Sequence, residues 1–199
     1  MNKNHFSKLL IGALAVSLLL PGCSNKAANA KSSTETVQNE STETQNNNQI
    51  ETYFTRKDGN LDQILIKEMN TAQKNLNVAI YSLTKEDIAN AIMDAKKRGA
   101  DVKVITDKQE SQTKAQKAIL DKLKQDGIPV KINSHAGLMH LKVTVIDDKT
   151  ACGGSYNYTE NATKENDENL IIMRDPSIVS DYVNEFNNMW NNTSDYKNY

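Results

Sequence analysis

The sequence predicts an α/β fold in which a mixed central β-sheet is flanked by helices, with residues 49–199 forming a single domain. Two observations support this class. Short segments rich in β-branched residues alternate along the chain with amphipathic segments of helical period, an order typical of α/β domains. The segment is also long enough to bury a core of its own, and it contains no internal repeat.

The first three elements are expected to be a strand at 51–55, a helix at 61–75 and a strand at 77–81. The helix is predicted because apolar residues recur at helical spacing on one of its faces. These residues are Leu61, Ile64, Leu65 and Met69.

Helices and strands continue to alternate in the middle of the domain. The expected elements are a helix at 84–98, a strand at 101–106, a helix at 113–125 and a short strand at 130–132. Thr84 and Asp87 form a capping pair at the start of the first of these helices. Gly99 and Gly127 follow the two helices and are expected to end them.

The C-terminal part is expected to contain three strands and a long helix. They are strands at 140–146, 150–153 and 169–173 and a helix that begins at Pro176. Proline is favoured in the first turn of a helix, and apolar residues at helical spacing follow it. These residues are Val179, Tyr182, Val183, Phe186 and Trp190.

The residues that carry chemistry are concentrated between Met139 and Glu168. His140 and Lys142 are two positions apart in a predicted strand, so both side chains should project from one face of it. The alternate residues are expected to be buried, which fixes the register of the strand. They are Leu141, Val143 and Val145. One face therefore carries a nucleophile and a cation side by side.

Neutral hydrogen-bond donors are expected at the end of the next strand. That strand ends in glycines, which allow a close approach of the backbone to a ligand, and Ser155 and Asn157 follow it. An imidazole, an ammonium, a hydroxyl and an amide around one point suit a tetrahedral anion, and a phosphate diester is the natural candidate. Phosphoryl transfer needs a nucleophile and charge neutralisation, which His140 and Lys142 would supply. Either Glu168 or Asp147 could orient the imidazole.

The spacing of these residues resembles a known signature. His140-x-Lys142-x4-Asp147, followed by Gly154-Ser155-x-Asn157, is similar to the HKD motif of the phospholipase D superfamily. The small size of the chain and the residues Asn157-Tyr158-Thr159 and Asn166-x-Glu168-Asn169 are most similar to the short bacterial endonuclease branch of that superfamily. The resemblance covers nearly all of residues 49–191 and implies the α/β sandwich of the phospholipase D-like nucleases.

The resemblance also implies a mechanism and an assembly. It implies a covalent phosphohistidine on His140, a role for Lys142 and Glu168 in catalysis, and binding of the substrate phosphate by Lys142, Ser155 and Asn157. The equivalent histidine of a second motif would protonate the leaving group. Since this chain has one motif, the resemblance implies a homodimer with the active site at the interface, and two-fold dimers are common. No metal and no cofactor are expected.

Other residues of the motif region have simpler interpretations. Asp147 and Gly154 are expected to be structural, Asp147 as a cap at the strand end or a partner of a nearby base. His135 is expected to be a surface residue or a contact at the substrate rim. Cys152 is the only thiol of the folded domain, which excludes an intrachain disulfide there, and it is expected to be a buried small hydrophobe.

The N-terminal residues are expected to be a targeting segment. Residues 1–22 contain a short basic region and an apolar run too short for a permanent membrane span, and Leu20-Pro21-Gly22-Cys23 resembles a bacterial lipobox. This predicts export, cleavage before Cys23, and a lipid anchor on its sulfur at the extracytoplasmic face of the cell membrane. An ordinary signal peptide or an uncleaved anchor is the alternative. Residues 23–48 are polar and are expected to be a flexible tether.

Charge gives little support for a nucleic-acid substrate, because the net charge of the whole chain is −1. Three functions remain open on the basis of the sequence. A DNA endonuclease, with RNA as a further substrate, is favoured by the short architecture with one motif and by the tether. A phospholipase or phosphatidyl transferase is favoured by the anchor, but the sequence shows no apolar entry surface. A binding lipoprotein without activity is disfavoured by the intact motif.

Overall fold

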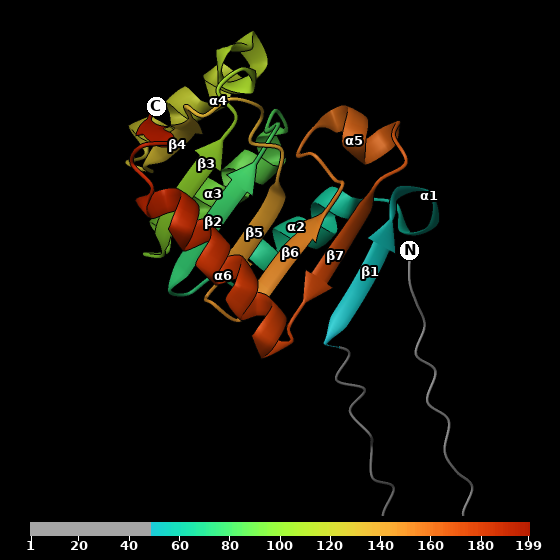
Figure 1. Cartoon of the computed structure of the whole chain (residues 1–199). Coiled ribbons are helices and arrows are strands. Elements are labelled where there is room, and N and C mark those ends of the chain that lie inside the picture. Colours follow the sequence, from blue (N-terminus) through green and yellow to red (C-terminus); the bar gives the residue numbers. More distant parts are fainter. Residues whose placement is uncertain (1–48) are drawn as a thin grey trace, which may run out of the picture. The chain divides into compact units, whose positions relative to one another are not determined.

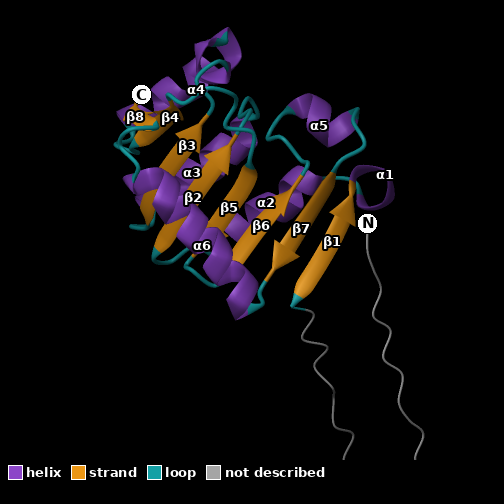
Figure 2. Cartoon of the chain, in the orientation of Figure 1, coloured by secondary structure: helices purple, strands orange, loops and turns teal. Residues whose placement is uncertain are grey.

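The computed structural model describes residues 49–199, which form a mixed sheet of eight strands with helices on both faces (Figures 1 and 2). The strands lie side by side in the order β1-β7-β6-β5-β2-β3-β4-β8. Their bounds are β1 Ile50–Phe54, β2 Asn75–Ile80, β3 Asp101–Thr106, β4 Val130–Asn133, β5 Lys142–Ile146, β6 Thr150–Gly154, β7 Asn169–Met173 and β8 Tyr196–Asn198. The predicted α/β class with a mixed sheet is therefore confirmed. The expected signal peptide, Cys23 and tether lie outside the described residues.

The helices cover the two faces of this sheet unequally. They are α1 Thr55–Asp58, α2 Leu61–Met69, α3 Glu86–Lys97, α4 Lys114–Gln125, α5 Glu160–Lys164 and α6 Pro176–Asn191, with a 3₁₀ turn η1 at Glu110–Gln112. The larger apolar core contains buried residues of α2, α3 and α4, whereas α6 crosses the other face over β5 and β6 (Figure 1). Within residues 49–199, no helix is long and apolar enough to cross a bilayer.

The topology brings several loops together at one end of the sheet. β2, β3 and β4 are parallel, and β5 and β7 run in the opposite direction. The segments that precede β5 and β7 therefore lie at the same end as those that follow β1, β2, β3 and β6, at the top of Figure 1. We call this the catalytic end. The described chain begins at the opposite end, where the carbonyl of Gln49 accepts a hydrogen bond from the backbone of Arg174.

The strand predicted at 140–146 begins later than expected. β5 starts at Lys142, and Leu141, which was expected to be buried, is 39% exposed. The reason is that the backbone before β5 leaves the sheet, because the N–H of Met139 donates to the carboxylate of the buried Asp107. The expectation of burial is correct for Val143 and Val145.

Two helix boundaries also differ from the prediction. The helix expected at 61–75 ends at Met69, because the following turn donates three backbone N–H groups to the carboxylate of Asp147. The capping pair proposed for Thr84 and Asp87 is wrong. α3 begins at Glu86, and the N–H groups of Thr84 and Lys85 both donate to the carbonyl of Tyr158.

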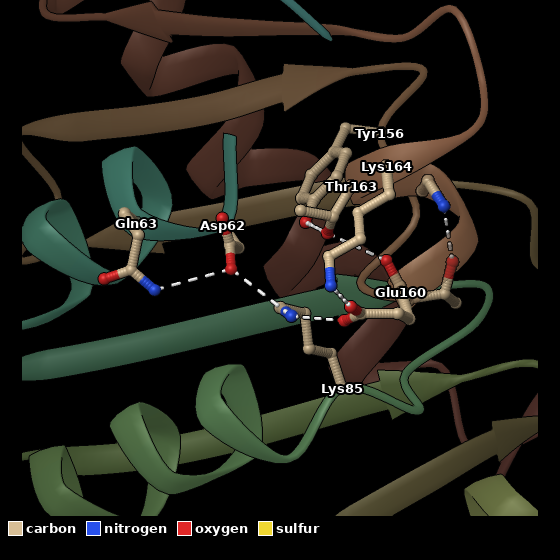
Figure 3. A network of polar contacts seen from close by, with 9 residues as sticks. Asp62, Gln63, Lys85, Tyr156, Glu160, Thr163 and Lys164 are labelled. Carbon is tan, nitrogen blue, oxygen red and sulfur yellow. Dashed lines mark hydrogen bonds and ion pairs between the residues drawn. The ribbon is translucent and has the colours of Figure 1, made fainter. Parts of the chain in front are cut away.

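A charged network joins α2, the segment before α3, and α5 (Figure 3). The ammonium of Lys85 lies 3.3 Å from the carboxylate of Asp62 in α2 and also pairs with Glu160 in α5, and Lys164 pairs with Glu160 as well. Both Lys85 and Asp62 are almost completely buried. The network therefore joins α2, the start of α3 and α5, and so fixes the segment between β6 and β7.

The protonation of Glu160 should make this network sensitive to acid. Hydrogen bonds from Lys164 and Lys85 lower the pKa of Glu160 to about 2, from an ordinary value of 4.5. Because the folded-state pKa is lowered, the stabilisation is present above about pH 4.5 and is lost as the pH falls through about 2. We expect Glu160→Gln to lower the melting temperature of the full chain at pH 6, and this difference from the wild type should vanish near pH 2.

Thermal unfolding followed by circular dichroism at several pH values measures this effect. Glu165→Gln is a matched control, since the Glu165 carboxylate makes no ion pair within the described residues. A difference between Glu160→Gln and the wild type that did not change with pH would contradict the assignment.

Candidate active site

The predicted motif residues meet at the catalytic end of the sheet. His140 and Lys142 lie at the start of β5, Ser155 follows β6, and Glu168 precedes β7. The side chain of His140 is exposed, whereas Lys142 is 7% exposed. The site therefore presents an accessible imidazole beside a buried cation.

The imidazole of His140 and the ammonium of Lys142 are in direct contact. Lys142 Nζ lies 3.0 Å from Nδ1 and 3.2 Å from Nε2 of His140, and it donates to the His140 carbonyl at 2.8 Å. His140 and Lys142, which are two positions apart in the sequence, therefore lie side by side as predicted, although His140 lies just outside the strand. A phosphoryl group bonded to either ring nitrogen would lie beside the ammonium.

Tyr81 is a third member of this group that the sequence analysis did not identify. Its ring centroid lies 4.5 Å from that of His140, and Lys142 Nζ lies 5.1 Å from it, within the range of a cation–π contact. The Tyr81 N–H also donates to the carbonyl of Leu141 at 2.8 Å. Tyr81 thus holds both the ring of His140 and the backbone that carries it.

The buried ammonium of Lys142 lacks a paired anion within the described residues, so it can bind an anion that enters the site. Burial lowers the pKa of the Lys142 ammonium below its usual value, and the negative charge of Glu168 opposes this shift. Burying a cation without a paired anion is unfavourable, so an anionic group that enters the site gains a strong interaction. This arrangement favours an anion with oxygen acceptors, as the sequence predicts.

Glu168 is held by several hydrogen bonds, none of which comes from the His140 ring. Its carboxylate accepts from the hydroxyl of Ser155 at 2.5 Å and from the amide of Asn166 at 3.0 Å. Its backbone N–H donates to the hydroxyl of the buried Thr55 at 3.0 Å. Within this chain Glu168 is rigidly placed near Lys142, and the role predicted for it, orienting the imidazole, stays a prediction.

The other predicted phosphate ligands are placed differently. The hydroxyl proton of Ser155 is donated to Glu168, so a phosphate must displace this bond before Ser155 can donate to it. In Asn157 the side-chain carbonyl oxygen is buried and has no partner within residues 49–199. Gly154 has a φ of +131°, and a Cβ there would lie 2.4 Å from the carbonyl oxygen of Asn169. Only glycine allows this close approach.

Asp147 lies at the far end of β5 from His140. Its carboxylate accepts hydrogen bonds from the backbone N–H groups of Gln73, Lys74 and Asn75, at distances from 2.7 to 3.1 Å. These bonds lower the pKa of Asp147, against the effect of its burial. The last residue of the His-x-Lys-x4-Asp motif therefore caps the turn before β2 and takes no part in the site.

Two buried polar residues position the loop that carries His140. Asp107 is fully buried, and its carboxylate accepts from the N–H groups of Gln109, Glu110 and, at 2.9 Å, Met139. The amide of Asn133 donates to the carbonyl of Gly137 at 3.1 Å. Asp107 directly follows β3 and Asn133 ends β4, both on the side of the site, which is the sequence signal that could have identified them.

The remaining residues singled out in the sequence lie beside the site or beneath it. His135 is half-buried in the same loop, and its ring lies edge-on to Tyr196, which matches a surface position more than a catalytic one. Cys152 is a free, buried thiol whose pKa is raised by burial, as expected for a small hydrophobe. Within the described part of the chain, no group of three or more His, Cys, Asp or Glu residues is placed to hold a metal ion.

The expectation that no apolar surface adjoins the site is wrong. Leu138 and Leu141, on either side of His140, are 44% and 39% exposed. Leu141 also lines an apolar pocket with residues of α6, among them Tyr182 and Phe186. The sequence pattern did not reveal this surface because it assigned Leu141 to the buried side of a strand.

The family model described as "Cardiolipin synthase, PLD-like domain" matches residues 65–190, which is more than half of the chain. The chain belongs to the phospholipase D-like family. The family resemblance of the motif is therefore confirmed, and the domain has the fold of this family.

Curated relatives with this domain carry two kinds of name. The chain is 29% identical to a mitochondrial cardiolipin hydrolase of Chlamydomonas reinhardtii over 61% of its own length and 54% of the relative's length. It is 31% identical to a phospholipase D of Rickettsia bellii over 67% of its own length and 65% of the relative's length. The match thus spans about half to two thirds of these relatives.

Two solved structures of similar fold are matched over almost their full length. The phospholipase D family member Nuc from Salmonella typhimurium is 26% identical with a TM-score of 0.70, and the match covers 75% of this chain and 97% of that one. NucT from Helicobacter pylori is also 26% identical, with a TM-score of 0.63 and coverage of 71% and 96%. The described domain therefore matches almost the whole of both solved chains.

The contact between Asp107 and Met139 yields a test of how the His140 loop is positioned. In Asp107→Asn, an NH₂ group must replace one of the two acceptor oxygens, so a backbone N–H loses its partner. We expect the turnover number on bis(p-nitrophenyl) phosphate to fall about tenfold or more through misplacement of His140, with KM little changed. Steady-state kinetics measure both constants.

Asp101→Asn is the matched control, because Asp101 begins the same strand at the other end of the sheet and is exposed there. An Asp107→Asn protein as active as this control would contradict the positioning role.

Proposed function

We propose that the protein is a phosphodiesterase that hydrolyses polynucleotides, mainly DNA and also RNA, through a phosphohistidine on His140 and without a metal ion. The observation that carries this proposal is the exposed imidazole of His140 in contact with the buried ammonium of Lys142. These two groups supply the nucleophile and the charge neutralisation that phosphoryl transfer needs.

The reaction proceeds in two displacements at phosphorus. In the first, a ring nitrogen of His140 forms a P–N bond, the P–O bond to one nucleotide breaks, and the leaving oxygen takes a proton. Lys142 neutralises charge on the non-bridging oxygens, and the amide of Asn157 donates to one of them. In the second, water attacks phosphorus, loses a proton to the group that protonated the leaving oxygen, and releases His140 as the P–N bond breaks.

The proton donor in this scheme is the His140 of a second copy of the chain. Within residues 49–199 the other histidine, His135, lies against Tyr196 and contacts no motif residue, so one chain lacks a second histidine at the site. The exposed Leu138 and Leu141 beside His140 would be covered in a homodimer with two-fold symmetry. Such a dimer forms one composite site at the interface, to which each chain contributes its His140.

Several features favour a polymer in solution as the substrate. The sequence resembles the short endonuclease branch, and Nuc and NucT are matched over 97% and 96% of their chains. We further propose export, lipidation at Cys23 and a tether at residues 23–48. The described chain begins at the sheet end opposite His140. The tether would therefore join the domain at the end away from the site, which leaves the catalytic end free to face soluble substrates.

A second candidate is hydrolysis or phosphatidyl transfer on membrane phospholipids. It is favoured by the apolar side chains of Leu138 and Leu141 next to His140 and by relatives named cardiolipin hydrolase and phospholipase D. Both activities use the same attack by histidine, so the substrate distinguishes them. We prefer a polynucleotide as the substrate because the domain is small and because the described chain begins at the end of the sheet opposite His140.

Cleavage of supercoiled plasmid in excess EDTA tests the proposed activity. We expect the purified full chain to nick and linearise the plasmid, and His140→Ala to lose at least about a thousandfold in rate because no P–N bond can form. Circular dichroism checks that the variant is folded. Phospholipid vesicles are assayed in parallel, and hydrolysis of lipid without cleavage of plasmid would replace the proposed substrate with the second candidate.

Mixing the wild type with inactive protein tests the shared site. The composite site of the dimer needs both copies of His140, so a mixed dimer is inactive. After subunit exchange with a ninefold excess of His140→Ala, random pairing should lower wild-type activity to about one tenth. Sedimentation of the full chain gives its oligomeric state independently. Unchanged activity after exchange that has been verified with tagged subunits would show that one chain forms a complete site.

A further inference from the structure

Phe54 is a large aromatic residue that the fold leaves exposed at the catalytic end. Its side chain is 46% exposed, one of four large hydrophobic side chains with high exposure among the described residues. It ends β1, where it pairs with Asn169, the neighbour of Glu168. Its N–H donates to the carboxylate of Asp58 at 2.8 Å, so the backbone that carries the ring is fixed. The ring thus projects from a fixed backbone next to the candidate site.

An open pocket connects this ring with the residues that surround the phosphate site. It is lined by Phe54, Thr55, Arg56, Ser155, Asp167, Glu168 and Asn169. Ser155 and Glu168 belong to the candidate site, and the negative charge of Glu168 favours the charged form of Lys142. A substrate whose phosphate lies at His140 and Lys142 therefore has its neighbouring group within reach of this pocket.

The charges of the pocket indicate what that group is. The guanidinium of Arg56 pairs with Asp167 at 2.7 Å and donates to the carbonyl of Glu165, so it is already neutralised. Glu168 adds a further negative charge, which disfavours a second phosphate here. The feature left to attract a ligand is the exposed ring of Phe54. A flat, uncharged group with a π-face suits such a ring.

We propose that Phe54 is a stacking site for the nucleobase of a nucleotide adjacent to the scissile phosphate. This inference rests on the proposed function. It predicts that the site prefers polynucleotides whose bases are accessible. In single strands the bases are free to stack on protein side chains, whereas in a duplex they are stacked on one another. The enzyme therefore prefers single-stranded polynucleotides, and the contact is independent of base identity.

The test compares ordinary and abasic substrates with variants of Phe54 in the full chain. A single-stranded oligonucleotide and its counterpart of the same length with abasic sugars present the same phosphates, but only the first has bases. Because stacking on an aromatic side chain is worth on the order of tenfold or more per base, we expect wild-type kcat/KM to be about tenfold higher for the ordinary strand. Phe54→Ala should remove this preference and leave cleavage of the abasic strand unchanged.

Three further proteins make the result specific. Phe54→Trp should retain the preference because it keeps a π-face, whereas Phe54→Leu should lose it. Ile50→Ala is the matched control, since Ile50 is 49% exposed on the same strand at the opposite end of the sheet. This control should behave as the wild type does.

Each other result overturns the inference in a recognisable way. A preference that survives in Phe54→Ala, or is absent from the wild type, shows that no base stacks on Phe54. Retention in Phe54→Leu shows an apolar contact instead of stacking. Equal loss on both strands in Phe54→Ala shows a structural role. If the wild type cleaves neither strand, the proposed function fails, and the inference fails with it.

Discussion

The buried ammonium of Lys142 is the constraint around which the site is built. A lysine that is 7% exposed requires compensation, and the structure supplies it only in part, through the nitrogens and carbonyl of His140, the face of Tyr81 and the charge of Glu168. No carboxylate within the described residues forms an ion pair with this ammonium. The ammonium is therefore able to bind an anionic ligand, next to the imidazole of His140, which is exposed to solvent.

The rest of the catalytic end serves to hold these groups in place. Tyr81 fixes the backbone after His140, and Asp107 fixes the backbone before it. Thr55 binds the backbone of Glu168, while the network from Asp62 through Lys85 to Glu160 supports the segment that precedes it (Figure 3). Each support comes from a different strand end or helix start, which is why a mixed sheet with several loops at one end suits this chemistry.

Much of the fold and the chemical centre was predictable because it depends on local pattern. The alternation of β-branched residues located the strands, and the spacing of His140 and Lys142 placed their side chains together. The errors arise where distant groups decide the local structure. Asp107 draws Met139 away from the sheet, so β5 starts late and Leu141 is exposed. The carbonyl of Tyr158 accepts from the N–H groups of Thr84 and Lys85, so α3 begins at Glu86 without the expected cap from Thr84. Tyr81 and Asp107 carry no motif, and only their positions at strand ends could have suggested a role.

The proposed mechanism requires a covalent bond between His140 and the substrate phosphorus, and isolating that adduct would reveal it. The full chain would be mixed with an oligonucleotide, stopped in alkali, where the P–N bond of phosphohistidine survives, and digested for mass spectrometry. We expect a nucleotide or phosphoryl adduct on the peptide that contains His140, and this adduct should disappear in acid. An active enzyme with no such adduct under single-turnover conditions, or with an adduct on another residue, would contradict it.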